Sequence, residues 1–206
     1  MQTHIIGVGA TGSRVALSLI QMRQNMTIYD FDHVEEKNLQ NQVYRMPDIG
    51  LLKVDAMSAI GKSMDWPIAS HNMRVESCKD MSGIIFCLTD TMKSRKELWN
   101  SVNPFTCTMW IETRLGVDQC RVYCIDPSDP QQSQEYAKTL YSDDVGVERT
   151  ACGTIAPALL STAEICAGFA VSAFNRFVTG NKAENELLLW SDPPTVMTRH
   201  FQSQTV

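Results

Sequence analysis

The stretch T-H-I-I-G-V-G-A-T-G, residues 3–12, decides the predicted fold of this chain. Its apolar first half is typical of a buried strand, and its glycines lead into a helical pattern over residues 13–24. Gly7 permits a tight turn, Gly9 lets the backbone approach a phosphate, and Gly12 lets the helix pack closely. The N–H groups that open the helix would face an anion. The stretch therefore indicates a nucleotide site, and a turn of this kind without a ligand is the alternative.

Asp30 strengthens the nucleotide interpretation. It follows a second apolar strand, residues 26–29, at the distance after Gly12 at which such folds place an acid on a ribose hydroxyl. The kind of nucleotide stays open at this point, because a dehydrogenase uses the same glycines and the same acid.

The run from Asp30 to Lys53 separates these two kinds of enzyme. It reads D-F-D-H-V-E-E-K-N-L-Q-N-Q and then, after a short interval, I-G-L-L-K. A dinucleotide dehydrogenase has no need of this polar series. The run resembles the ThiF/MoeB/HesA superfamily, the adenylating enzymes related to ubiquitin-activating enzymes, and the resemblance continues through L-T-D, residues 88–90. It covers residues 3–122 well and residues 149–180 more loosely.

The resemblance implies a role in MgATP binding for each matching residue. The three glycines would hold the phosphates through their backbone, Asp30 would bind the ribose, and Lys53 would meet phosphate oxygens as a point charge. Asp90 would hold Mg²⁺, which binds through one or two carboxylates plus oxygens of the nucleotide. Asn38 and Gln42 match further site positions of the family. Taken singly, each residue also has a structural interpretation, such as a helix cap for Asp90.

An ATP-dependent adenylyltransferase is the function that the resemblance implies. Such an enzyme brings a substrate carboxylate onto the α-phosphate of ATP and expels pyrophosphate, so positioning and positive charge dominate the catalysis. The substrate would be the C-terminal carboxylate of a small ubiquitin-like or sulfur-carrier protein, usually ending in Gly-Gly in this family, and the enzyme would be a homodimer. Two alternatives stay open: a catalytically degenerate nucleotide- or partner-binding module of the same fold, and an NAD(P)-dependent oxidoreductase.

Three departures from the family pattern bear on activity. Asn41 stands where the family has an arginine, which removes a cation that faces phosphate, and Arg14 and Arg45 are the candidates to replace it. Thr91 takes the place of the usual asparagine after L-T-D. The sequence starts at its first strand, so we expect it to lack the N-terminal helix that can carry an arginine across the dimer in family members. The missing arginines favour the degenerate-module alternative.

The cysteines are the least specific indication of function in the sequence. Seven of them are scattered without paired spacing, which favours reduced thiols in a cytoplasm over a disulfide framework. Cys152 lies in the segment E-R-T-A-C-G-T and is a candidate catalytic thiol, because some relatives form a thioester after their crossover loop; a buried structural cysteine is the alternative. Cys120 and Cys124 lack the second pair that family zinc sites supply, so we do not expect zinc.

Composition and charge bound the remaining possibilities. A chain of 206 residues with 44% hydrophobic content suits one substantial core, so we expect a single adenylation domain over residues 1–206. The net charge of −5 argues against a nucleic-acid surface. Charged residues interrupt the long apolar stretch, and no basic leader precedes the first strand, so neither a membrane span nor a signal peptide is expected. The protein is predicted to be cytoplasmic.

Alternating strand and helix patterns predict the α/β class, with a Rossmann-like, mostly parallel sheet flanked by helices. Period-two alternation over residues 117–126 indicates a later strand in a partly antiparallel region. Prolines and acids over residues 126–150 indicate an exposed connection with a short helix at 135–140, which corresponds to the crossover loop of the family. Helices are expected at residues 50–64, 92–102 and 154–178, and strands at residues 68–75, 83–87, 106–112, 186–190 and 195–201.

Overall fold

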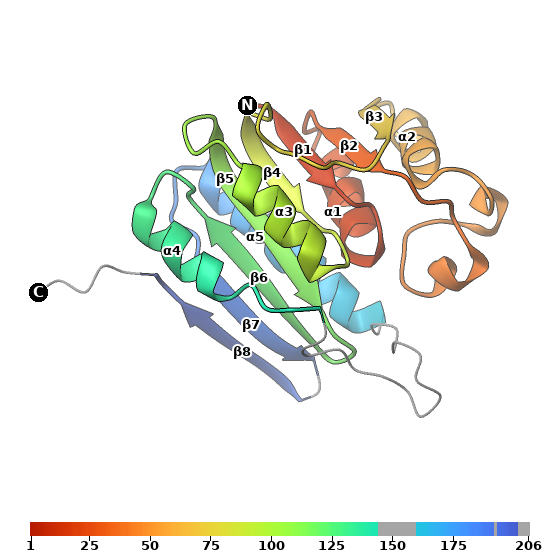
Figure 1. The fold of residues 1–206 in the computed structure, drawn as a ribbon. Coiled ribbons are helices and arrows are strands. Elements are labelled where there is room, and N and C mark those ends of the chain that lie inside the picture. The colour runs from red at the N-terminus through yellow and green to blue at the C-terminus, as the bar shows by residue number, and fades with distance from the viewer. Residues whose placement is uncertain (144–159, 192, 202–206) are drawn as a thin grey trace, which may run out of the picture.

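One mixed sheet runs through the molecule. The computed structural model describes residues 1–143, 160–191 and 193–201. Within them, eight strands lie in the order β3-β2-β1-β4-β5-β6-β7-β8, and helices cover both faces of the sheet (Figure 1). The predicted α/β class and the Rossmann-like arrangement of a mostly parallel sheet with a later antiparallel part are confirmed.

The first five strands of that order are parallel. They are β3 (Ala69–Asn72), β2 (Thr27–Asp30), β1 (Thr3–Ile6), β4 (Gly83–Cys87) and β5 (Cys107–Leu115). In the centre of this half, Ile5 of β1 pairs with Ile28 of β2 on one side and with Phe86 of β4 on the other. β1 and β4 are buried along their whole length, as expected for parallel strands that are covered on both faces.

The other three strands continue the sheet in antiparallel fashion from β5. They are β6 (Gln119–Ile125), β7 (Glu186–Ser191) and β8 (Pro194–Arg199). A tight hairpin joins β5 to β6, with Leu115 opposite Cys120. The alternation that predicted β6 reappears in its packing, because Val122 belongs to the core on one face of the sheet and Tyr123 to the core on the other.

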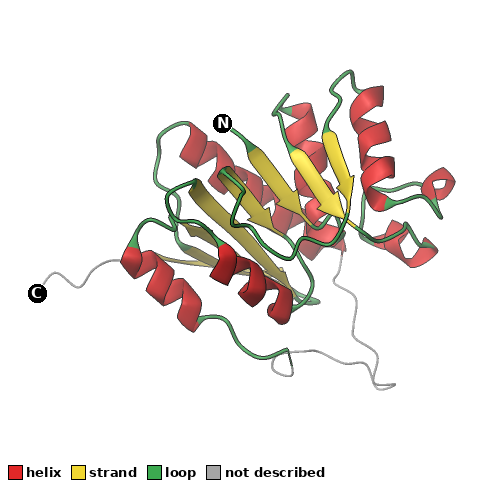
Figure 2. Ribbon diagram, turned by 45° about the horizontal axis from the view of Figure 1, so that its top comes forward, coloured by secondary structure: helices red, strands yellow, loops and turns green. Residues whose placement is uncertain are grey.

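Helices divide between the two faces (Figure 2). The larger core packs beneath α1 (Ala10–Gln21), α2 (Lys53–Ser63) and α5 (Leu160–Val178), while α3 (Met92–Ser101) and α4 (Pro130–Lys138) cover the smaller core on the opposite face. Two short 3₁₀ helices, η1 (Glu36–Gln40) and η2 (Met46–Asp48), lie in the connection between β2 and α2. This connection contains most of the run that carries the family resemblance.

Several element boundaries differ from the prediction: the first helix runs over Ala10–Gln21 instead of residues 13–24, the second begins at Lys53 instead of residue 50, and the last strand ends at Arg199 instead of residue 201. Three further differences have a local reason. α4 begins at Pro130 because the Asp129 carboxylate accepts hydrogen bonds from the next two free N–H groups and proline suits a first helical position. β3 stops at Asn72 because β2, the strand beside it in the sheet, ends at the paired residue Asp30. β5 extends to Leu115 because the hairpin with β6 prolongs its pairing.

Two predicted features lie partly outside the described residues. They are the start of the helix expected at residues 154–178 and the end of the connection at residues 126–150. None of the helices in the described ranges combines the length and apolar character needed to cross a lipid bilayer.

Candidate functional site

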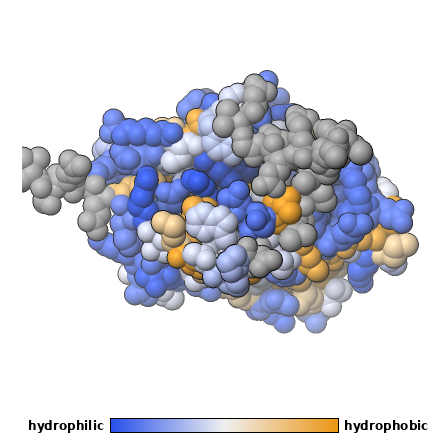
Figure 3. Space-filling view, turned by 90° about the horizontal axis from the view of Figure 1, so that it is seen from below, coloured by the Kyte–Doolittle hydropathy of each residue, from blue (hydrophilic) through white to orange (hydrophobic). Residues whose placement is uncertain are grey.

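A pocket of about 400 Å³ opens at the carboxyl end of β1, β2 and β4. Ligands of open α/β sheets bind at this edge, where connections leave the strands in different directions. Figure 3 views the molecule from the end to which these strands point, and hydrophilic side chains cover most of the surface that is not grey. Six of the predicted site residues line the pocket: Gly7, Gly9, Asp30, Gln42, Lys53 and Asp90.

The glycine loop forms the floor of the pocket, and two of its positions admit only glycine. Gly7 has a φ of +92°, and a Cβ there would lie 2.7 Å from the carbonyl oxygen of Leu88. At Gly12 a Cβ would lie 2.0 Å from the carbonyl oxygen of Gly7, so α1 rests directly on the loop. Gly9 faces open space, because a Cβ there would meet no atom within 4 Å. No side chain of the described residues caps α1, and this arrangement suits an anion.

Two buried side chains hold the loop through the backbone of Val8. The Val8 N–H donates to Oδ2 of Asp30 at 2.7 Å, and the hydroxyl of Tyr44 donates to the Val8 carbonyl at 2.8 Å. The second carboxylate oxygen of Asp30 accepts from the N–H of Asp32 at 2.9 Å. Asp30 therefore orders the loop, and it keeps lone pairs for a further donor. Burial raises the pKa of Tyr44, so its hydroxyl stays a donor.

Lys53 reaches the pocket from the first residue of α2. Its ammonium group lies 2.9 Å from Oδ2 of Asp32, and its backbone N–H donates to the Asp32 carbonyl. Lys53 is only 6% exposed, so its position is fixed and part of its charge is already compensated. Gln42 lines the pocket beside it, and among the described residues its buried Oε1 has no hydrogen-bond partner.

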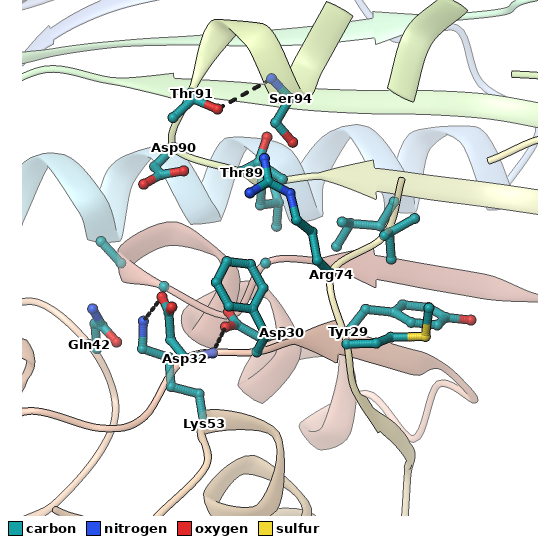
Figure 4. A pocket seen from close by; sticks show the side chains of 18 residues that line it. Tyr29, Asp30, Asp32, Gln42, Lys53, Arg74, Thr89, Asp90, Thr91 and Ser94 are labelled. Carbon is teal, nitrogen blue, oxygen red and sulfur yellow. Dashed lines mark hydrogen bonds and ion pairs between the residues drawn. The ribbon is translucent and has the colours of Figure 1, made fainter. Parts of the chain in front are cut away.

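Asp90 lies on the opposite wall of the pocket, after the end of β4. The side chain is exposed and makes no hydrogen bond or ion pair with any described residue. The cap of α3 comes from Thr91 instead, whose hydroxyl accepts from the N–H of Ser94 at 3.2 Å (Figure 4). A free carboxylate beside a glycine loop suits a hard cation such as Mg²⁺, which uses one or two carboxylates and oxygens of its nucleotide.

A buried ionic cluster supports the strand end that carries Asp90. Glu112 lies 3.0 Å from Arg95 and 2.9 Å from Arg114, and it accepts from the Tyr136 hydroxyl at 3.0 Å. Arg95 also donates to the Thr89 carbonyl, the residue before Asp90. This cluster joins β5 to α3 and α4.

Two residues that line the pocket, and one that holds its glycine loop, were missed by the sequence interpretation. Phe31 lies directly after Asp30, and Arg74 lies in the connection from β3 to β4, with its guanidinium carbon 5.9 Å from the centre of the Phe31 ring. Tyr44 holds the loop from below. Because no motif marks residues 73–75, only the path of the chain across the sheet edge brings Arg74 here.

Several predicted residues do not line the pocket. Gly12 lies in α1 and packs against the Gly7 carbonyl. The side chain of Asn38 caps η1 by accepting from the N–H of Glu35 at 2.9 Å. Arg14 donates to the Asn41 carbonyl at 2.7 Å and pairs with Glu164. The other candidate cation, Arg45, pairs with Asp48 at 3.3 Å. Cys152 lies outside the described residues.

The six cysteines in the described ranges are buried and free. Burial raises the pKa of four of them, Cys78, Cys87, Cys107 and Cys124, to about 12. Thiols with such a pKa are poor nucleophiles at neutral pH, because the thiolate is the reactive form.

Comparisons with known proteins agree on the family and the fold. The model of the ThiF family matches residues 1–203. Among solved structures, PaaA is 17% identical, with a TM-score of 0.75 over 97% of this chain and 64% of that one. The microcin C7 biosynthetic enzyme MccB in complex with N-formylated MccA is 14% identical, with a TM-score of 0.73 over 100% of this chain and 66% of that one.

MccB from E. coli has also been solved with ATP, and that structure is 13% identical to this chain, with a TM-score of 0.71 over 100% of this chain and 65% of that one. At such identities the likeness shows a shared fold. The chain spans about two thirds of the length of these structures. No curated protein matches the sequence.

Proposed function

Because the chain belongs to the ThiF family, we propose that it is an ATP-dependent adenylyltransferase that activates the C-terminal carboxylate of a small ubiquitin-like or sulfur-carrier protein ending in Gly-Gly. One observation carries the proposal. An open glycine loop, a buried lysine and an aspartate without a partner among the described residues meet in a single pocket, although they come from the end of β1, from α2 and from the end of β4.

The proposed reaction forms one bond and breaks another at the α-phosphate. An oxygen of the substrate carboxylate attacks the phosphorus, and the bond to the oxygen that bridges the α- and β-phosphates breaks. Pyrophosphate leaves with the electron pair, and the product is an acyl-adenylate. Because the protein makes no covalent bond in this step, its contribution is positioning and charge stabilisation.

The residues of the pocket divide this work. Gly9 brings its backbone N–H to the phosphates, while Gly7, whose own N–H donates to the Tyr29 carbonyl at 2.8 Å, permits the turn that opens the loop. Asp30 accepts from the ribose while it holds the loop. Lys53 meets phosphate oxygens from its fixed place in α2. Asp90 holds Mg²⁺, which when bound neutralises charge on the phosphate oxygens.

The partner, assembly and location remain part of the proposal. MccB has been solved with MccA and with ATP, which supports a nucleotide and a small partner for this fold. We propose a homodimer of single adenylation domains, as in the family, and a cytoplasmic location, where scattered cysteines stay reduced. A catalytic Cys152 would form a thioester after the adenylate, and a Cys152→Ser variant that still forms adenylate but no thioester would show it.

Calorimetry of nucleotide binding tests the proposed site. ATP with Mg²⁺, ATP with a chelator, and NAD are titrated into the wild type, into Asp90→Asn, and into the control Asp80→Asn, which removes an exposed carboxylate outside the pocket. We expect Mg²⁺-dependent ATP binding that Asp90→Asn loses and Asp80→Asn keeps. Pyrophosphate exchange with a Gly-Gly-ended carrier then tests the chemistry.

Other outcomes would overturn the proposal. Preference for NAD would indicate the oxidoreductase. Binding of ATP without pyrophosphate exchange against any carrier would indicate the degenerate module. A wild type that binds no nucleotide would overturn the adenylyltransferase and leave a module that binds a partner only.

A further inference from the structure

The pocket is short of positive charge for a triphosphate. Among the described residues that line it, three carry carboxylates, namely Asp30, Asp32 and Asp90, and two carry cations. One of those cations, Lys53, already pairs with Asp32 at 2.9 Å. A polyanion bound here needs a further cation, since unbalanced charge in a partly buried site is costly.

The arginines expected to supply this further cation contact other groups of the protein. Asn41 supplies no charge, and neither of the candidates that could replace it lines the pocket. Arg14 donates to the Asn41 carbonyl and pairs with Glu164 of α5, and these contacts hold its guanidinium outside the pocket. Arg45, the residue before η2, pairs with Asp48 at the end of that helix.

Arg74 is the pocket cation without a carboxylate partner among the described residues. It comes from the connection that follows β3, and its side chain extends across the pocket toward Thr89 and Ser94 (Figure 4). Within the described ranges its side chain contacts the ring of Phe31, 5.9 Å from the guanidinium carbon, in an exposed cation–π contact of modest strength. All five guanidinium N–H donors are therefore available to oxygens of a ligand.

We propose that Arg74 binds a phosphate group of the nucleotide and replaces the cation that is absent at Asn41. This inference rests on the proposed function, because it assigns the charge of the same ATP site. The end of β3 at Asn72 makes it geometrically possible: pairing with β2 stops there, and the chain turns across the sheet edge. Guanidinium suits the role because its planar fork matches phosphate oxygens.

A comparison of ligands with and without phosphate tests the proposal. Dissociation constants for ATP, AMP and adenosine are measured on the wild type, Arg74→Gln and Arg74→Lys, at low and high salt. Lys79→Gln is the matched control, because it removes one exposed cation from the same connection without touching the pocket. Circular dichroism verifies that each variant is folded.

Arg74→Gln is expected to weaken ATP binding about tenfold, the loss of one charge-assisted hydrogen bond, and to change adenosine binding less than about twofold. The loss should shrink at high salt, and Arg74→Lys should recover most of it. Lys79→Gln should match the wild type.

Two results would overturn the inference alone: ATP binding by Arg74→Gln equal to the wild type, or an equal loss for ATP and adenosine, which would assign Arg74 to the base. A wild type that binds no nucleotide would instead overturn the proposed function and this inference with it.

Discussion

At the scale of single residues, the glycine loop depends on groups that meet its backbone from several sides. Asp30 and Tyr44 hold the N–H and the carbonyl of Val8. Gly12 allows α1 to lie against the Gly7 carbonyl. These contacts fix where the N–H groups point, so the binding properties of the loop follow from the residues that hold its backbone in place.

Gly12→Ala should destabilise the protein by about 1–3 kcal/mol, because the new methyl group overlaps the Gly7 carbonyl and the loop must shift. Gly168→Ala is the control: it lies in α5, and a Cβ there meets nothing within 4 Å. That variant should be unchanged or about 0.5–1 kcal/mol more stable, since alanine favours helix. Urea unfolding measures both, and equal stabilities would refute the packing role of Gly12.

At the scale of secondary structure elements, polar side chains fix how helices meet the sheet. Glu112 joins β5 to α3 through Arg95 and to the end of α4 through Arg114, which also donates to Thr139. Asp129 starts α4 by accepting two backbone N–H groups. The strand end that precedes Asp90 is thus connected, through Arg95 and Glu112, to α4.

Glu112→Ala should destabilise the fold by about 3–5 kcal/mol, because it leaves two buried guanidinium groups without their carboxylate. The exposed Glu97, which lies 3.9 Å from Lys93, offers a control. Its replacement by alanine should cost less than about 1 kcal/mol. Chemical denaturation gives both values, and a loss for Glu112→Ala no larger than for the control would contradict the supporting role of the cluster.

The Asp129 cap predicts a pH dependence. Hydrogen bonds from the backbone of Gln132 and Gln131 lower the pKa of Asp129 below its ordinary value. A carboxylate with a lowered folded pKa stabilises the protein above its unfolded pKa, near 4, and this contribution disappears as the pH falls through the folded pKa. Asp129→Ala should therefore cost about 1 kcal/mol at neutral pH and progressively less in acid. The difference in unfolding free energy between this variant and the wild type, measured across pH, checks the trend, and a difference that stays constant into acid would contradict it.

At the scale of the whole molecule, the eight-stranded sheet separates two tasks. The parallel half carries the pocket at its carboxyl edge, and the antiparallel half extends the sheet through β6 to β8. Cysteines are distributed through both cores, and the described ones are buried. Their chemistry consequently reports on opening of the entire fold.

The buried cysteines of the described residues should react with a thiol reagent only at the rate at which the protein opens, because burial raises the pKa of thiols such as Cys87 and Cys124 to about 12. Reaction in urea should be fast and complete. The Cys152→Ser variant removes the seventh thiol, so any reaction that it shows comes from these six. If several thiols of that variant reacted quickly in the native protein, the burial described here would be wrong.

The sequence was sufficient for the order of elements because period-two and helical patterns are local. It also identified the pocket residues that stand in motifs, Asp30, Lys53 and Asp90 among them. The sequence did not predict the positions of Arg74 and Tyr44. Each lies in a connection between elements, and the path of such a connection depends on where strand pairing stops. The same limit explains Arg14 and Arg45: proximity in sequence suggested phosphate contacts, while nearby carboxylates hold both elsewhere.

Gly9 offers a way to uncouple ligand occupancy from folding. Its φ of −78° lies outside the left-handed region, and a side chain there would project into empty space rather than into protein. A bulky side chain at this position would therefore occupy the pocket beside the glycine loop. The protein should still fold, but the pocket should no longer admit a nucleotide. Such a variant would be a reagent for asking which cellular interactions need the nucleotide and which need only the shape of the protein.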